Sequence, residues 1–255
     1  MKHWKENILA PLAFTVALIL LWELACVLFK LPATVLPTPS AVAKAMVQYW
    51  PAIWDNSLQT LMTTLLGFGL AIVFGLVLGV AIGWSKLIYG ALYPVMIAFN
   101  AVPKVAVVPI LIIWFGIGTI PAIFTAFLIS FFPIVVNVAT GLATTEPELQ
   151  DVLRALGASK LDVVRKVGIP RSMPYFFGSL KVAITLAFVG SVVSETIGAN
   201  SGLGKMMLDA QAGFNVELVF AGVAALAILG IALYAVTALV EKRFTGWAFR
   251  AEGIG

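Results

Sequence analysis

Charged residues, histidine and cysteine are all scarce in this chain. Only 11% of its 255 residues are charged, against roughly 25% in a typical soluble domain. The single cysteine, Cys26, excludes an internal disulfide and a metal site built on cysteines. The single histidine, His3, lies near the N-terminus. These shortages argue against metal-dependent and histidine-dependent enzymes.

Apolar residues in long runs make up most of the remainder, at 61% of the chain. A soluble fold of this length could not bury so many of them, whereas a bilayer does not penalise their exposure. A membrane-spanning helix needs about 20 apolar residues. The predicted spans are 9–29, 58–83, 88–113, 119–142, 173–196 and 215–240. We therefore expect an all-α integral membrane protein with about six transmembrane helices.

The first span raises the question of a cleaved signal. Its apolar run, Leu9 to Phe29, is longer than the apolar region of a signal peptide, which has about 7–15 residues. Leu24-Ala25-Cys26 is similar to a lipoprotein processing site, but Glu23 interrupts the apolar run just before it. We expect an uncleaved transmembrane helix, with processing as the alternative.

Prolines interrupt the third predicted span at Pro94, Pro103 and Pro109. Proline removes a backbone donor and kinks a helix. Inside a membrane such a break is tolerated where the freed carbonyls face protein or a wet cavity. The sequence therefore predicts that this span is broken and buried among other helices.

The basic residues predict the orientation. They lie in short loops between apolar runs, so the net charge of +4 reflects membrane topology and not a nucleic-acid partner. With the N-terminus inside, eleven lysines and arginines are cytoplasmic and three, Lys30, Lys44 and Lys205, are outside. Both termini are therefore expected in the cytoplasm. The expected units are an N-terminal helix and outer loop with a short helix (1–57), a core (58–241) and a cytoplasmic tail (242–255).

The longest polar segment, 144–171, is expected on the cytoplasmic side. Thr145 and Glu148 form a capping-box pattern. Apolar residues then recur with helical spacing from Leu149 to Leu156, and Gly157 is a helix-stop signal. The pattern predicts a short amphipathic helix.

A second short helix is expected directly afterwards. Ser159 and Asp162 can cap it, and Pro170 is expected to end it. The segment holds no nucleophile–base pair and no ligand cluster. It is either an amphipathic loop at the membrane surface or a docking surface for a cytoplasmic partner.

The docking interpretation rests on a resemblance. The residues that carry it are Asp151-Val152-Leu153, Arg154-Ala155-Leu156-Gly157-Ala158-Ser159 and Val167-Gly168-Ile169-Pro170. They resemble the coupling loop of binding-protein-dependent ABC transporter permeases. That loop reads Glu-Ala-Ala, three residues, Gly, nine residues and Ile-x-Leu-Pro, and the spacing here is the same. Asp-Val-Leu replaces Glu-Ala-Ala, and Val-x-Ile-Pro replaces Ile-x-Leu-Pro.

Other motifs are similar to the nitrate, taurine and aliphatic-sulfonate branch, which also includes permeases for pyrimidine precursors of thiamine. They are Leu36-Pro37-Thr38-Pro39-Ser40, Trp114-Phe115-Gly116-Ile117-Gly118 after Pro109, Ser194-Glu195-Thr196-Ile197-Gly198 and Ser201-Gly202-Leu203-Gly204. The resemblance covers nearly the whole chain.

The resemblance implies a type I ABC importer permease in the cell inner membrane. Two permease subunits, expected as a homodimer, would form the pathway. Separate cytoplasmic ATPase subunits would bind ATP-Mg, and a periplasmic or lipid-anchored binding protein would deliver the solute. The residues expected to couple to the ATPase are Asp151, Val152, Leu153, Arg154, Ala155, Gly157, Ala158 and Pro170.

Four ionisable residues fall within or near the ends of spans, where charge is costly. Lys104, near Asn100, would either attract an anion in the pathway or form an internal ion pair, with Glu195 as a possible partner. Glu195 would belong to a gate or to a structural network. Lys181 is expected to snorkel to the cytoplasmic face, and Glu23 to be an interfacial residue.

Small residues recur every four positions in the second span, at Gly67, Ala71, Gly75, Gly79 and Gly83. Such a ridge lets another helix approach closely. It would serve either packing within one subunit or a sliding or dimer surface.

The sequence shows no nucleotide site of its own. Gly202-Leu203-Gly204-Lys205 is not a phosphate loop, because Ala199 stands where the first glycine should be and Met206 replaces Ser/Thr. No cofactor is therefore expected in the chain, and ATP hydrolysis is expected in a partner.

We expect a permease that imports a small solute such as a sulfonate, taurine or a nitrate-like anion. A thiamine-precursor pyrimidine or related heterocycle is the alternative substrate. A secondary carrier or channel is the alternative class. A membrane-embedded enzyme would need clustered histidine, cysteine or carboxylate residues, which the sequence lacks.

Overall fold

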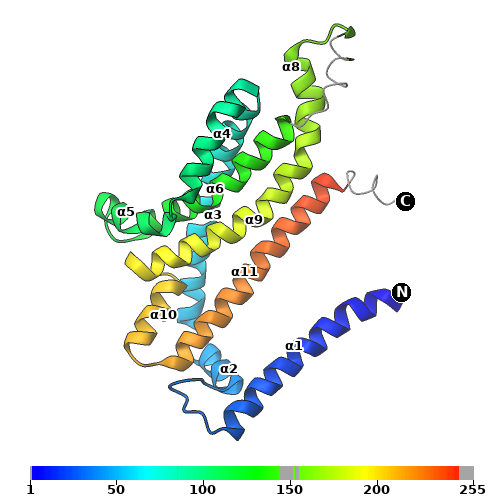
Figure 1. Ribbon diagram of the computed structural model, residues 1–255. Helices are drawn as coiled ribbons and strands as arrows, with labels where there is room; N and C mark the ends of the chain where they lie inside the picture. The colour runs from blue at the N-terminus through cyan, green and yellow to red at the C-terminus, as the bar shows by residue number, and fades with distance from the viewer. Residues whose placement is uncertain (1, 85, 144–151, 153–154, 247–255) are drawn as a thin grey trace.

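The structure of the protein, a computed structural model, describes residues 2–84, 86–143, 152 and 155–246. Every element in those ranges is helical, as predicted (Figure 1). The elements are α1 (Lys2–Leu28), α2 (Pro39–Gln48), α3 (Trp50–Gly83), α4 (Lys86–Ala101), the 3₁₀ helix η1 (Lys104–Val107), α5 (Val108–Phe115), α6 (Thr119–Ala143), α8 (Lys160–Val163), the π-helix η2 (Val164–Gly168), α9 (Ile169–Gly198), α10 (Leu203–Ala212) and α11 (Val216–Thr245).

Within the described residues, five helices are long and apolar enough to cross a membrane, and a bent pair makes a sixth span when its two halves are counted as one. The five are Leu9–Leu28, Trp50–Gly83, Thr119–Leu142, Leu161–Gly198 and Val216–Thr245; the pair is Leu87–Ala101 with Lys104–Phe115, bent by 74°. The predicted number of spans is confirmed.

The second span begins earlier than predicted. Helix α3 starts at Trp50, directly after α2, because Pro51 lies in its first turn, where proline's missing donor costs nothing. The expected boundary between 57 and 58 therefore falls inside a continuous helix.

Helices α3, α6 and α9 form the centre of the bundle, and the small-residue ridge of α3 faces α6. A Cβ atom built on Gly75 would lie 2.7 Å from Ile134 Cγ2, and one on Gly79 would lie 2.7 Å from Val138 Cβ. Ala71, on the same ridge, is fully buried. The ridge is therefore a packing surface within one subunit.

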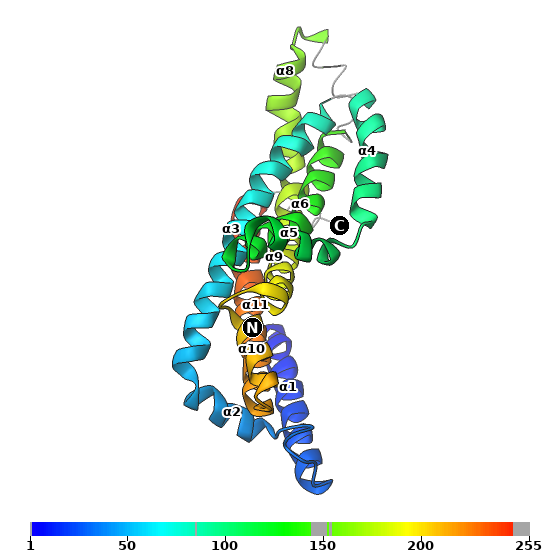
Figure 2. The ribbon, with the colours of Figure 1, turned by 90° about the vertical axis from the view of Figure 1, so that its left-hand side faces the viewer.

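The helices give the molecule two distinct ends. Helices α2 and α10 lie at one end, and α8 projects from the other (Figures 1 and 2). Helix α1 diverges from the bundle (Figure 1), and only 6% of its span is buried. It meets α11 near α2, where the rings of Trp22 and Phe220 are 6.0 Å apart.

The third span is broken, as predicted, but only its α5 half has buried side chains, at Val108 and Leu111. None of the α4 side chains that the structure describes is buried. A backbone carbonyl near the break has a local hydrogen-bond partner, because the Lys104 ammonium donates to the Asn100 carbonyl at 2.5 Å. Helices α4 and α5 instead present apolar side chains to the exterior, including Leu87 and Ile113 at 83% and 80% exposure.

The packing of the ridge predicts a sharp difference between two glycine substitutions. Gly75→Ala forces a methyl group against Ile134 and should lower the free energy of unfolding by about 1–3 kcal/mol. Gly69→Ala is the control, because no atom lies within 4 Å of its Cβ position, and it should be neutral or stabilising by about 1 kcal/mol. Unfolding in mixed detergent micelles measures the free energy of unfolding of both variants, and equal changes in the two would contradict this packing.

Candidate coupling surface and translocation site

The described part of the coupling loop has the predicted turn. Gly157 has φ of +83° and open space around it, a backbone conformation that disfavours residues with a Cβ. Ser159 and Asp162 cap each other. The Asp162 carboxylate accepts from the Ser159 amide at 3.2 Å, and the Ser159 hydroxyl accepts from the Asp162 amide at 3.2 Å. Asp151, Leu153 and Arg154 lie outside the described residues.

Pro170 does not end a helix, contrary to the prediction. It lies in the first turn of α9, directly after the π-helix η2, so the helical path continues through it. Helix α8 and the π-helix η2 lead into α9 without a gap, so the second half of the loop is an extension of a transmembrane helix. Figure 1 shows α8 projecting from the end of α9.

The exposed surface of this loop is mixed, because Arg165 and Lys166 are exposed alongside its apolar residues. Leu156, Leu161 and Val152 are 79%, 62% and 56% exposed. Ala155 and Gly157 are also exposed, and Ala158 is half-buried. Figure 2 shows α8 extending beyond the neighbouring ends of α3 and α4. The loop therefore projects from the bundle with both apolar and charged side chains exposed.

Glu195 lies at the opposite end of α9, and it is 1% exposed. One carboxylate oxygen accepts from the Thr60 hydroxyl at 2.9 Å and from the Gly204 amide at 3.0 Å. The other accepts from the hydroxyls of Thr63 at 3.3 Å and Ser191 at 3.4 Å. The carboxylate therefore joins α3, α9 and α10.

The glycine-rich turn before α10 is held by the same cluster. Asn56 Oδ1 accepts from the Gly202 amide at 2.8 Å, and the Thr60 hydroxyl accepts from the Leu203 amide at 2.9 Å. Gly202 has φ of +114°, so this turn requires glycine. The geometry of the Glu195 cluster is that of a structural network at the end of the bundle that carries α2 and α10.

Sequence reasoning identified Glu195 but missed its partners. Thr60, Thr63 and Ser191 are buried polar residues within predicted spans. Two hydroxyl groups at an i, i+3 spacing in the second span could have indicated a partner for Glu195, because a buried polar group requires a hydrogen-bond partner.

Lys104 and Asn100 are bound to each other and not to Glu195. The Lys104 ammonium donates to the Asn100 side-chain oxygen at 2.6 Å as well as to the Asn100 carbonyl. It lies 5.9 Å from the centre of the Phe99 ring. The suggested Lys104–Glu195 pair is therefore wrong, since hydroxyl and amide donors already occupy the Glu195 carboxylate. No described carboxylate pairs with Lys104.

Two further ionisable residues have partners that the sequence did not indicate. The Lys181 ammonium is 2.6 Å from the Glu241 carboxylate and joins α9 to α11, while its expected snorkelling stays a prediction. Glu23 accepts from the amide and hydroxyl of Ser40 at 3.0 and 2.8 Å. It thereby caps the start of α2 alongside Thr38, which accepts from the Ala41 amide.

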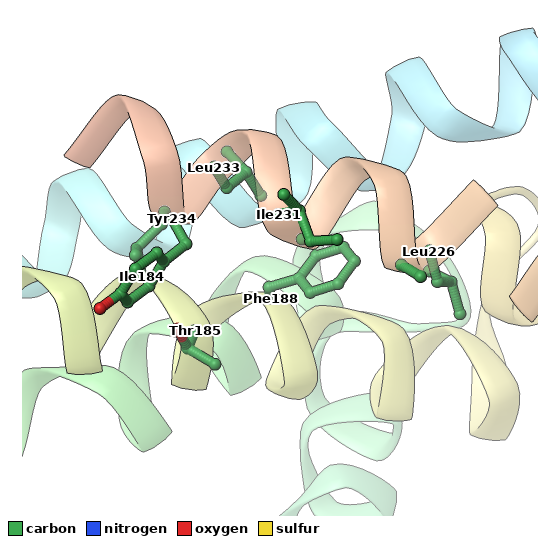
Figure 3. Close-up of a pocket in the computed structure, with 9 residues that line it drawn as sticks. Ile184, Thr185, Phe188, Leu226, Ile231, Leu233 and Tyr234 are labelled. Atoms are coloured by element: carbon green, nitrogen blue, oxygen red, sulfur yellow. The ribbon is translucent and has the colours of Figure 1, made fainter. Parts of the chain in front are cut away.

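An apolar groove of about 400 Å³ lies between α9 and α11, lined by residues such as Phe188, Leu226 and Tyr234 (Figure 3). The Thr185 hydroxyl in this groove donates to the Lys181 carbonyl of its own helix at 3.0 Å. The groove offers little to a polar solute, so it is not a candidate for the pathway.

The cluster around Glu195 predicts the effect of neutralising it. Glu195→Gln places an amide group among groups that donate hydrogen bonds, and a donor left unsatisfied costs about 1–3 kcal/mol. The variant should unfold at a lower temperature in detergent. Glu217→Gln, an exposed carboxylate in the first turn of α11, is the matched control and should leave the midpoint unchanged. A Glu195→Gln midpoint equal to that of the control would contradict the network.

Comparison with known proteins agrees with this arrangement. Residues 71–246 match the family model described as "Binding-protein-dependent transport system inner membrane component". The chain is 30% identical to the formylaminopyrimidine transport permease protein ThiX of Halalkalibacterium halodurans, over 94% of this chain and 96% of the relative. It is 33% identical to the riboflavin transport system permease protein RibX of Chloroflexus aurantiacus, over 90% and 87%.

A third relative is the putative aliphatic sulfonates transport permease protein SsuC of Bacillus subtilis, 29% identical over 98% of this chain and 90% of the relative. Among solved structures, a chain of the inward-facing MetNI methionine ABC transporter matches with a TM-score of 0.67. It is 21% identical, over 78% of this chain and 98% of that chain, and it supports the type I importer permease fold. The chain belongs to the family of binding-protein-dependent inner-membrane transport components, the permeases of ABC transporters.

Proposed function

We propose that this chain is one of two permease subunits of an ATP-driven importer for a small solute. The observation that carries the proposal is the continuity of the coupling loop with α9. The run from Leu161 to Gly198 has 38 residues, or about 57 Å at about 1.5 Å per helical residue. Its loop end would contact an ATPase, and its other end holds Glu195. A movement imposed at the loop would therefore reach the far side of the membrane along one helix.

A second copy of the chain would cover the exposed face of α4 and α5. This face is apolar, yet it includes Asn100 and the Lys104 ammonium at the bend of the third span. Polar groups at membrane depth face protein or water. A homodimer that meets here would place both lysines beside a shared pathway.

The substrate that we favour is a small solute that carries an anionic group, such as a sulfonate, taurine or a nitrate-like ion. The support is the Lys104 cation, which no described carboxylate neutralises, and the likeness to the sulfonate relative. A thiamine-precursor pyrimidine is the alternative, supported by the formylaminopyrimidine relative. The riboflavin relative extends the alternative to other heterocycles.

The partners follow from the family. Cytoplasmic ATPase subunits would bind ATP-Mg and dock on the segment that includes Asp151–Arg154, Ala155, Gly157 and Ala158. A periplasmic or lipid-anchored binding protein would meet the opposite end. This arrangement puts the chain in the inner membrane with both termini cytoplasmic, and it leaves catalysis to the ATPase. The two separate ends of the bundle, α8 and α2 with α10, support it.

Purification from gently solubilised native membranes tests the proposal. The wild-type chain should carry a stoichiometric ATPase that hydrolyses ATP. Gly157→Val should insert normally but lose at least tenfold in recovered activity, because a β-branched residue resists φ of +83°. Gly157→Asn is the control, since asparagine tolerates this conformation better. The chain recovered alone from several mild detergents would instead favour a secondary carrier or channel.

The proposed role of Lys104 predicts a selective defect in uptake. Lys104→Gln should reduce uptake of labelled taurine at least tenfold, because it removes the cation while keeping a group that can donate to the Asn100 carbonyl. Lys44→Gln, an exposed lysine of α2, should have no effect. A normal rate of taurine uptake by the variant would contradict the proposed role of Lys104. Import of a labelled thiamine-precursor pyrimidine by the wild type, without uptake of taurine, would exclude the anionic substrate.

A further inference from the structure

Phe214 occupies a position where glycine is the usual residue. Helix α10 ends in a Schellman-type turn. The Phe214 amide donates to the Gln211 backbone carbonyl at 3.0 Å, and the Asn215 amide donates to the Ala210 backbone carbonyl at 2.8 Å. Phe214 takes the left-handed position of this turn, with φ of +56°. Glycine is favoured there because a Cβ is strained. A chain with 22 glycines places an aromatic residue in this turn.

The Phe214 side chain gains nothing from burial, since the residue is 85% exposed. The backbone turn that carries it is nevertheless held in place. Asn215 accepts from the Leu218 amide at 3.1 Å and so caps α11, and its side-chain amide donates to the Tyr49 hydroxyl at 3.1 Å. The α10–α11 turn is thereby tied to the α2–α3 turn, at the end of the bundle away from α8 (Figure 1).

An apolar hollow lies next to Tyr49, on the α2–α3 side of this hydrogen bond. Ala43, Met46, Val47 and Trp50 surround a space of about 470 Å³ on α2 and the start of α3. Val47, two residues before Tyr49, is 79% exposed. The Tyr49–Asn215 hydrogen bond therefore holds a projecting aromatic ring and an apolar hollow on one end of the molecule.

The location favours a soluble protein over lipid as the occupant. Helix α11 has 30 residues, or about 45 Å at about 1.5 Å per residue, against a hydrocarbon core of about 30 Å. Phe214 precedes this helix, with the exposed carboxylates of Asp209 and Glu217 close to it in the chain. A turn flanked by charged groups at the tip of so long a helix lies outside the hydrocarbon.

We propose that Phe214 is an anchor by which the solute-binding protein docks on the permease. The inference rests on the proposed function, which puts this end of the bundle on the outside, and on membership of a binding-protein-dependent family. Exposed aromatic residues that are held in place before contact are typical of such anchors, because little conformational entropy is lost on binding. The strained backbone at Phe214 serves this contact, since the exposed ring adds no buried contact to the fold.

Photocrosslinking identifies the partner. p-Benzoylphenylalanine in place of Phe214, irradiated in intact cells, should give an adduct with a solute-binding protein. The same probe in place of Leu239, an exposed residue of α11 expected to face lipid, should give none. An adduct with phospholipid at position 214, or no protein adduct, overturns the inference.

The captured binding protein is then purified and added to the permease–ATPase complex in lipid nanodiscs. Phe214→Gly should raise the concentration for half-maximal stimulation of ATP hydrolysis at least tenfold, with unchanged basal hydrolysis. Its thermal midpoint should not fall, because glycine suits the left-handed position. Lys30→Gly is the matched control: Lys30 has φ of +48° in an equivalent turn after α1. This variant should be stimulated normally.

The outcomes separate this inference from the proposed function. Equal stimulation of the wild type and Phe214→Gly overturns the docking role of Phe214 and leaves the importer intact. A purified chain without any ATPase overturns the importer itself.

Discussion

The absence of water in the hydrocarbon core is the constraint on which the rest of this structure depends. A polar group at membrane depth must find its partner inside the protein. Glu195 meets this demand with hydroxyls from α3 and α9 and an amide from α10. Lys181 pairs with Glu241. Near the break in the third span, the Asn100 carbonyl accepts a hydrogen bond from the Lys104 ammonium. Each solution joins two helices or stabilises a break, so the requirement for hydrogen bonds also fixes the arrangement of the helices.

Close packing supplies the second part of the architecture. Gly67, Gly75 and Gly79 let α6 approach α3 until side chains contact backbone. In lipid, such packing replaces the hydrophobic drive that operates in water. The centre is tightly packed, while α4 and most of α1 remain exposed. These exposed helices are where lipid and a second subunit would complete the molecule, and the rigid centre is what would carry a movement between its ends.

Local features were predictable because their causes are local. The left-handed turn at Gly157 and the mutual capping of Ser159 and Asp162 each depend on a few consecutive residues. The proline-induced break of the third span was predicted for the same reason. The errors have a different origin. Pro170 is compatible with either end of a helix, and only its neighbours in space decide that it begins α9. The partners of Lys181 and Glu195 lie far away in sequence, at Glu241 and at Thr60 and Thr63.

The sequence by itself determined the class of the protein, the approximate number of spans, the turn at Gly157 and the family resemblance, because composition, apolar run length and motif spacing are properties of the linear chain. The tertiary structure decided which charges meet and which surface the glycine ridge serves. It also revealed that the coupling loop continues into α9 and that Phe214 projects from the opposite end. Such contacts join residues separated by tens of positions, and no local pattern specifies them. They arise when the helices pack and each buried polar group takes the donor or acceptor that packing brings within reach.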